Sequence, residues 1–157
     1  MRAVAYSIKS SEKEPLAIAN RKKHDITLIS NALSEDTVVY AEGKEAVIVF
    51  VDDEVSEKVI NRLADLGIKY IATRSTSVEH IDKQAAVSRN IRIANVPASI
   101  LKEDSQEALS MALAAETILN LDKWQRKKCL GSSCVCSRAC DQHSDLFDSS
   151  KEDDHEN

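Results

Sequence analysis

The sequence predicts an α/β protein in which a doubly wound, parallel sheet of five strands carries a packed C-terminal helix. Short apolar segments alternate with helical segments, which favours parallel strands joined by right-handed crossovers. Residues 46–51, AVIVFV, are apolar on both faces, as in a central strand covered by helices on both sides. A long helical pattern over residues 100–128 follows the last strand, so we expect this helix to pack on the sheet.

Five segments have the length and apolar content of strands, and none contains a glycine or a proline. They are residues 2–8, 25–30, 46–51, 68–73 and 91–94. Pro97 follows the last of them and holds the preceding residue out of the helical region, so the chain should leave this strand extended.

The helices are recognised by their start and stop signals. Ser56 fits an N-cap and Gly67 a left-handed position just beyond the helix that it begins. Ser11 is a candidate cap for the first helix, and Asp104 with Glu107 has the spacing of a capping box. The expected helical ranges are 10–23, 56–66, 82–89 and 100–128, with a short polar helix or turn near 34–41.

The long C-terminal helix should bury one apolar face against the sheet. Trp124, near its end, is interpreted as a packing residue that covers a sheet edge or the first helix. The predicted buried face consists of Ala108, Met111, Ala112, Ala115, Ile118 and Leu119.

Charge is concentrated at the C-terminus. Residues 141–157 contain seven acids and one lysine, a net charge of −6, whereas the whole chain carries −5. Neither part has the basic face of a nucleic-acid binder. We expect an ordered domain at 1–128, a Cys-rich segment at 129–143 and an acidic, disordered tail at 144–157. With no apolar run long enough to span a bilayer and no secretory signal pattern, a cytoplasmic location is the default expectation.

The loop after the fourth strand is the candidate binding site. It contains Arg74, Ser75, Thr76 and Ser77 at the carboxyl end of a strand, where ligands of α/β sheets bind. Its backbone N–H groups and the helix start that follows could hold a carboxylate. His80 is interpreted as a surface or packed histidine rather than a catalytic base. Residues expected on the same rim are Tyr6, Ser7, Asp52 and Asp53.

Three stretches carry a family pattern in the right order: MRAVAYSIKSSEKE, AVIVFVDDEVSEKVINRLADLGIKYIATRSTSVEHID and IRIANVPA. Over residues 1–98 they resemble the substrate-binding domain of D-isomer-specific 2-hydroxyacid dehydrogenases, most of all the D-lactate dehydrogenases. The resemblance implies a flavodoxin-like domain with strand order 2-1-3-4-5. In that family the chain then crosses into a nicotinamide-binding domain and returns as a helix, which ILKEDSQEALSMALAAETILNLDKWQ resembles.

The resemblance therefore implies a family member without the middle domain. Thr76 and Ser77 match the loop whose amides hold the substrate carboxylate, although the family usually has glycine at the place of Ser77. The segment from Ala98 to Ile100 departs from the family's Tyr-Ser-Pro pattern, and the family's catalytic Arg, Glu and His match no position here. The three glycines, Gly43, Gly67 and Gly131, cannot form a dinucleotide fingerprint, so no NAD site is expected.

Two functions remain open at this point. One is a D-2-hydroxyacid dehydrogenase-like protein reduced to a stand-alone substrate domain that is not catalytic alone. The other is a non-enzymatic binding or assembly module with a metal- or thiol-bearing Cys-rich tail. In either case the rim that faces the nucleotide domain in the family would be open, with apolar surface near Val96, Ile100 and Leu101. A homodimer or a partner protein is expected to use this rim.

All four cysteines lie within twelve residues, as Cys129, Cys134, Cys136 and Cys140, with His143 nearby. Thiolates so close together could converge on zinc or an iron–sulfur cluster, with His143 as a spare ligand. A disulfide or redox pair, such as Cys134 with Cys140, and unpaired thiols are the alternatives.

Overall fold

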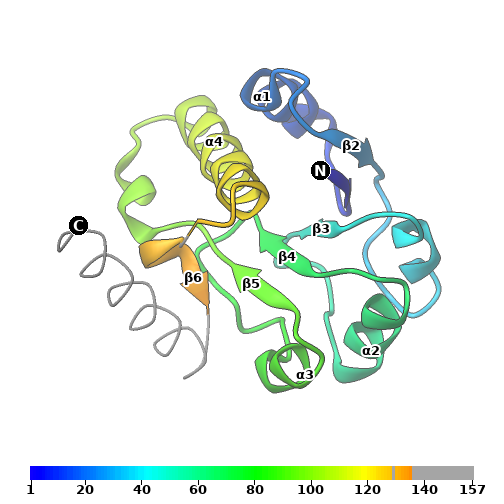
Figure 1. The fold of residues 1–157 in the computed structure, drawn as a ribbon. Coiled ribbons are helices and arrows are strands. Elements are labelled where there is room, and N and C mark those ends of the chain that lie inside the picture. The colour runs from blue at the N-terminus through cyan, green and yellow to red at the C-terminus, as the bar shows by residue number, and fades with distance from the viewer. Residues whose placement is uncertain (129, 136–157) are drawn as a thin grey trace, which may run out of the picture.

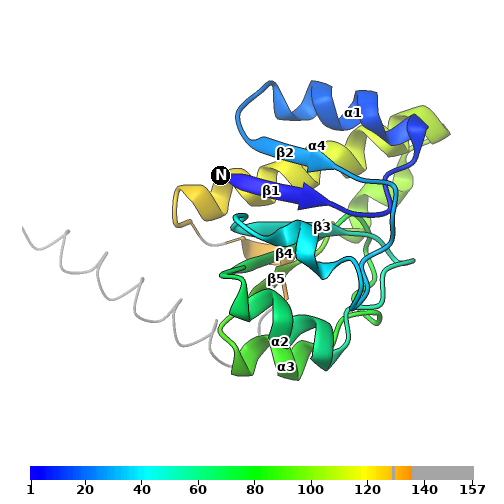
Figure 2. The same ribbon diagram turned by 90° about the vertical axis from the view of Figure 1, so that its right-hand side faces the viewer.

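The computed structural model describes residues 1–128 and 130–135. They form one mixed sheet with helices on both faces (Figures 1 and 2). The strand order is β2-β1-β3-β4-β5-β6, so the predicted parallel order of the first five strands is confirmed. The strands are β1 Arg2–Ala5, β2 Asp25–Leu28, β3 Ala46–Val49, β4 Tyr70–Thr73, β5 Arg92–Ala94 and β6 Cys134–Val135.

Helices cover the sheet in two layers. Figure 2 shows α1 and α4 on one face and α2 and α3 on the other. Each layer has its own apolar core, because the central strands are buried on both faces. The α-helices are α1 Ser10–Asn20, α2 Glu57–Asp65, α3 Lys83–Ser88 and α4 Gln106–Gln125, and the 3-10 turns are η1 Val38–Ala41, η2 Ala98–Lys102 and η3 Gly131–Ser133.

The capping signals are partly confirmed. Ser56 caps α2 by accepting from the Val59 N–H, and Gly67 beyond it has a φ of +93°. The cap predicted for α1 at Ser11 is wrong, because Lys9 is the N-cap and its N–H donates to the Glu12 carboxylate at 3.1 Å. Arg21 ends this helix with a φ of +48°, so α1 stops before the predicted residue 23.

The last helix begins later than expected. Residues 98–102 form the turn η2, and Ser105, not Asp104, caps α4 by accepting from the Ala108 N–H at 3.0 Å. Trp124 is buried and stacks on Tyr70 of β4, with the ring centroids 4.7 Å apart. It therefore packs on the face of the sheet rather than on an edge.

The predicted buried face of α4 is largely wrong. Ile118 is buried as expected, but Ala115 and Leu119 are exposed. The helix is apolar nearly all round, so periodicity could not select which face meets the sheet. The buried residues are Ala114, Thr117, Ile118, Asn120, Leu121 and Trp124.

The chain beyond residue 128 extends the fold, which the sequence did not predict. Strand β6 pairs antiparallel with β5, and the Asn95 N–H donates to the Ser133 carbonyl at 3.1 Å. Leu130 is buried in the core beneath α1 and α4. The core thus reaches beyond the predicted boundary, whereas the predicted acidic tail at 144–157 lies outside the described residues. Within the described part, no helix is long and apolar enough to cross a membrane.

Candidate functional site

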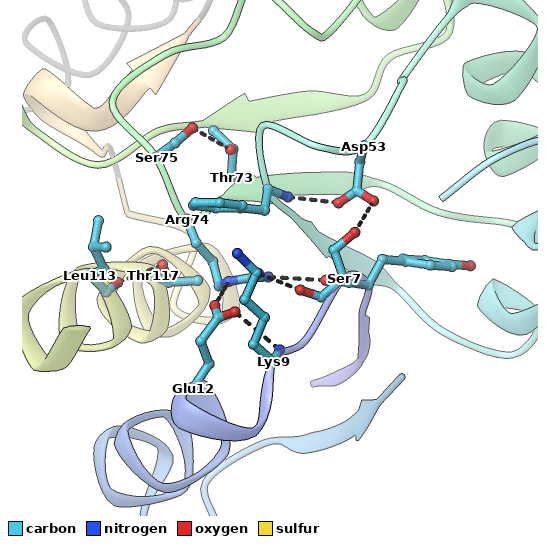
Figure 3. A network of polar contacts seen from close by, with 11 residues as sticks. Ser7, Lys9, Glu12, Asp53, Thr73, Arg74, Ser75, Leu113 and Thr117 are labelled. Atoms are coloured by element: carbon cyan, nitrogen blue, oxygen red, sulfur yellow. Dashed lines mark hydrogen bonds and ion pairs between the residues drawn. The ribbon is translucent and has the colours of Figure 1, made fainter. Parts of the chain in front are cut away.

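The candidate loop lies at the carboxyl end of β4 and leads toward α3. Arg74, Ser75, Thr76 and Ser77 are consecutive here, and the end of β1 and the loop after β3 reach the same edge of the sheet (Figure 3). The structure therefore brings the predicted rim together. The side chains nevertheless differ in where their polar groups point.

Three successive carbonyls of the loop accept hydrogen bonds from the protein. The Ser75 carbonyl accepts from the Val96 N–H at 3.0 Å, and the Thr76 carbonyl accepts from Asn95 Nδ2 at 3.0 Å. The Ser77 carbonyl accepts from Ser75 Oγ at 2.8 Å. The loop is thus held through its oxygens.

The backbone N–H groups that follow these carbonyls have no hydrogen-bond acceptor among the described residues. A planar trans peptide directs its N–H away from its C=O, so fixing three carbonyls also fixes the N–H groups of Thr76, Ser77 and Val78. Among the described residues, none accepts a hydrogen bond from these three N–H groups. Residues 76–78 are half-buried rather than fully covered. The loop therefore offers consecutive fixed donors, which is the chemistry of an anion site.

Arg74 faces away from these donors. Its side chain is 4% exposed, with Nε 2.9 Å from Glu12 Oε2 and the guanidinium over the Phe50 ring. Nη1 and Nη2 donate to the carbonyls of Tyr6 and Ser7 at 3.1 and 3.3 Å. Burial lowers the pKa of Arg74, and the Glu12 carboxylate opposes this shift. Figure 3 shows the Arg74 side chain directed at Glu12 of α1 and at the end of β1 near Ser7.

Asp53 is a buried anchor for three backbone segments. It is 1% exposed and accepts from Ser7 Oγ at 2.6 Å, the Leu33 N–H at 2.8 Å and the Phe50 N–H at 2.7 Å. Ser7 itself has a φ of +54°, which is unusual for a residue with a side chain. Asp52, by contrast, is exposed. The two aspartates that the sequence placed together thus differ in environment.

Tyr6 also points into the protein. It is fully buried, and its hydroxyl donates to the Thr37 carbonyl at 2.9 Å. Burial raises the pKa of Tyr6 well above its usual range, and the charge of Asp53 adds to the effect. The Tyr6 hydroxyl is therefore directed at Thr37 and is not offered to the loop donors.

His80 is half-buried, as expected for a packed histidine. Its Nε2 lies 3.3 Å from Thr73 Oγ1, and that hydroxyl lies 2.8 Å from Ser75 Oγ. Burial lowers the pKa of His80, with the charge of Asp53 acting in the opposite direction. The imidazole is therefore favoured in its neutral form.

The apolar rim is smaller than predicted. Val96 and Ile100 are buried, because β5 and η2 turn them inward, and only Leu101 of the three is exposed, at 58%. A pocket of about 130 Å³ lies nearby between α1 and α4, and its lining includes Lys9, Arg74 and Leu113 but not Thr76 or Ser77. Association through this rim stays a prediction.

Of the predicted metal ligands, the described residues include only Cys134. It begins β6, and its sulfur is disulfide-bonded, so in this state it offers no thiolate to a metal. No group of metal-ligating side chains occurs among the described residues. Cys129, Cys136, Cys140 and His143 lie outside them, and the metal centre stays a prediction.

Sequence reasoning missed two asparagines that support the loop. Asn95 reaches Thr76, and the buried Asn120 of α4 donates from Nδ2 to the Asn95 carbonyl at 3.1 Å. Asn95 carried a usable signal, because it is a polar residue directly after a strand. Asn120 carried another, because it lies at helical spacing among apolar residues.

Comparison with known sequences identifies a family. The family model described as D-isomer specific 2-hydroxyacid dehydrogenase, catalytic domain, matches residues 3–103. A 2-hydroxyacid dehydrogenase homolog of Zymomonas mobilis is 32% identical over 114 residues, which is 72% of this chain and 34% of that protein. The D-lactate dehydrogenase of Escherichia coli is 31% identical, covering 72% of this chain and 35% of the enzyme. The chain spans about a third of the length of these relatives.

Solved structures give the same picture. The apo-structure of D-lactate dehydrogenase from Escherichia coli matches with a TM-score of 0.61 and 33% identity, over 62% of this chain and 31% of that one. The pyruvate reductase of Chlamydomonas reinhardtii matches with a TM-score of 0.60 and 26% identity, over 87% of this chain and 42% of that one. Because 87% of the chain exceeds residues 3–103, the second likeness extends into the C-terminal part.

Proposed function

Since the chain belongs to the D-isomer-specific 2-hydroxyacid dehydrogenase family, we propose that it binds the carboxylate of a small 2-hydroxy or 2-oxo acid. The binding groups are the backbone N–H groups of Thr76, Ser77 and Val78. Several relatives are named D-lactate dehydrogenases, which favours a short acid such as lactate or pyruvate. The chain then acts as the substrate-binding domain of such an enzyme.

One observation carries this proposal: the carbonyls of Ser75, Thr76 and Ser77 are all hydrogen-bonded within the protein. Their fixed positions hold three N–H donors ready for an anion without further ordering of the loop. Preorganised backbone donors are a common way to bind carboxylates and phosphates. Because the loop is open on its other side, affinity should be weak, with a Kd of about 1 mM or above.

Reduction of the acid requires a nicotinamide beside it. Two similar structures, from Lactobacillus delbrueckii and Lactobacillus jensenii, are described as complexes with NAD, so NAD is the cofactor expected of the whole enzyme. This chain has no glycine-rich dinucleotide fingerprint. In our proposal the residues described here hold and orient the substrate, and the nucleotide site is not among them. The relatives named above are described as dehydrogenases, dehydrogenase homologs or reductases, which does not favour a non-enzymatic module.

The test is a titration of the ¹⁵N-labelled chain with D-lactate, followed by the amide resonances. We expect saturable downfield shifts at Thr76, Ser77 and Val78, because an N–H that gains a carboxylate acceptor is deshielded. Lactamide, which lacks the charge, should leave them unchanged. Asn95→Ala, which frees the Thr76 carbonyl, should weaken binding. Shifts that are spread over the surface and do not saturate would refute the site.

A further inference from the structure

We propose that His80 is a positioning residue for this loop, acting through the hydroxyls of Thr73 and Ser75 on the Ser77 carbonyl. This inference rests on the proposed function and deepens it. It assigns the orientation of one binding donor, the Val78 N–H, to a histidine that does not touch the ligand. The chain of contacts runs from His80 Nε2 to Thr73 Oγ1, to Ser75 Oγ and to the Ser77 oxygen.

Counting the hydrogens determines which atom donates in each hydrogen bond between His80 and Ser77. The Ser77 carbonyl can only accept a hydrogen bond, so Ser75 Oγ must donate its single hydrogen to that carbonyl, 2.8 Å away. Ser75 Oγ can then only accept from Thr73 Oγ1, 2.8 Å away, which uses the hydrogen of Thr73. Thr73 Oγ1 must in turn accept from His80 Nε2 at 3.3 Å. The imidazole therefore carries a hydrogen on Nε2.

Because the two hydroxyls are buried, each depends on its protein partner for a hydrogen bond. Thr73 is fully buried and Ser75 nearly so, which excludes bulk water as a substitute partner for either hydroxyl. A buried hydroxyl without a partner is costly, so losing one member disturbs the next. Hydrogen bonds in such a chain also polarise one another, which strengthens the last bond to Ser77.

The backbone around His80 is itself held in place. Its carbonyl accepts from the Val55 N–H at 3.0 Å, and the Asp82 N–H donates to the Val55 carbonyl at 2.9 Å. A short parallel bridge between Val55 and Ile81 results. The backbone that carries the His80 ring is therefore fixed by hydrogen bonds to Val55. A residue that orients other groups needs such a fixed position.

The consequence for binding is local. The Ser77 carbonyl and the Val78 N–H belong to one planar peptide, so a rotation of that plane turns the donor away from the ligand. The Thr76 carbonyl is held separately, by Asn95. Disturbing His80 or Thr73 should therefore affect Val78 most, whereas disturbing Asn95 should affect Ser77 most.

The first measurement is the tautomer of His80 from long-range ¹H–¹⁵N correlations of its ring. We expect the neutral form to carry its hydrogen on Nε2. A neutral ring with its hydrogen on Nδ1 would overturn the donor order and with it the inference.

The second measurement compares paired variants in the D-lactate titration. Thr73→Val removes the hydroxyl at nearly constant shape and should raise Kd about fivefold, as expected for one hydrogen bond. Thr73→Ser keeps the hydroxyl and should restore binding to within about twofold of wild type. His80→Leu should resemble Thr73→Val, and His80→Gln, whose amide can donate from the place of Nε2, should restore binding. Glu79→Gln is the matched surface control.

The outcomes separate this inference from the proposed function. If the wild-type chain shows no saturable shift, the proposed function fails and this inference fails with it. If wild type binds D-lactate and Thr73→Val binds equally well, only the inference fails. If Thr73→Val lowers stability but leaves the Val78 shift at saturation unchanged, the hydroxyl chain is structural and His80 does not position the donor. Loss of binding with a reduced Val78 shift supports the inference.

Discussion

The Arg74 guanidinium and the Glu12 carboxylate, 2.9 Å apart, join the end of β4 to the first turn of α1. Arg74 is buried, so removing its counter-charge should be costly. We expect Glu12→Gln to lower the free energy of unfolding by about 2 kcal/mol in urea denaturation. Binding of D-lactate should be unchanged, because neither side chain faces the loop donors.

A matched control is available in the Arg89–Asp65 pair, whose carboxylate lies 2.6 Å from the arginine at the surface. Asp65→Asn should cost less than about 1 kcal/mol, since exposed ion pairs contribute little. Equal losses for the two variants would show that the Arg74 pair has no special structural role.

The adjacent aspartates Asp52 and Asp53 provide a second contrast. Asp53 accepts hydrogen bonds from one hydroxyl and two backbone N–H groups, and an amide cannot accept all three. Asp53→Asn should therefore lower the unfolding free energy by about 3 kcal/mol, measured by urea denaturation. Asp52→Asn, at an exposed position, should change it by less than about 0.5 kcal/mol. Similar values for the two would contradict the anchoring role of Asp53.

The sheet could be predicted because its signals are local. The five parallel strands are short apolar segments, and Ser56 and Gly67 carry capping chemistry that depends on their own backbone positions. The position of the candidate loop could be predicted for the same reason, because the loop begins at the carboxyl end of β4 and that end is known once the strand is identified.

What escaped prediction depends on contacts between distant residues. The direction of the Arg74 side chain is set by Glu12, 62 positions earlier. The hydrophobic periodicity of the sequence gives no information about a pair so far apart. The buried face of α4 was ambiguous because the helix is apolar nearly all round. Strand β6 has two residues, too short for a pattern, and it exists by pairing with β5.

Tyr6 should make the free energy of unfolding fall at alkaline pH. Its pKa is raised in the folded state by burial, whereas in the unfolded chain it ionises near the usual value of about 10. Above about pH 10 the unfolded state thus binds fewer protons, and stability falls by up to about 1.4 kcal/mol per pH unit from this group.

Tyr6→Phe isolates this effect, because other groups titrate alike in both proteins. At neutral pH the variant should be less stable by about 1 kcal/mol, since the Thr37 carbonyl loses its partner. Above about pH 10 the difference should shrink and then reverse as pH rises. Urea denaturation at a series of pH values measures it, and a constant difference across the series would show that Tyr6 ionises normally.

The chain alone should not oxidise NADH in the presence of pyruvate. Hydride transfer needs the nicotinamide held beside the substrate, and the protein must supply that position. The three glycines of the chain cannot form a phosphate-binding fingerprint, and the loop at Thr76 to Val78 is proposed to hold only the carboxylate of the acid. The loss of NADH absorbance should match that of buffer, with a full-length D-lactate dehydrogenase as positive control. A rate proportional to the chain's concentration, and abolished by Asn95→Ala, would mean that the domain holds both reactants by itself.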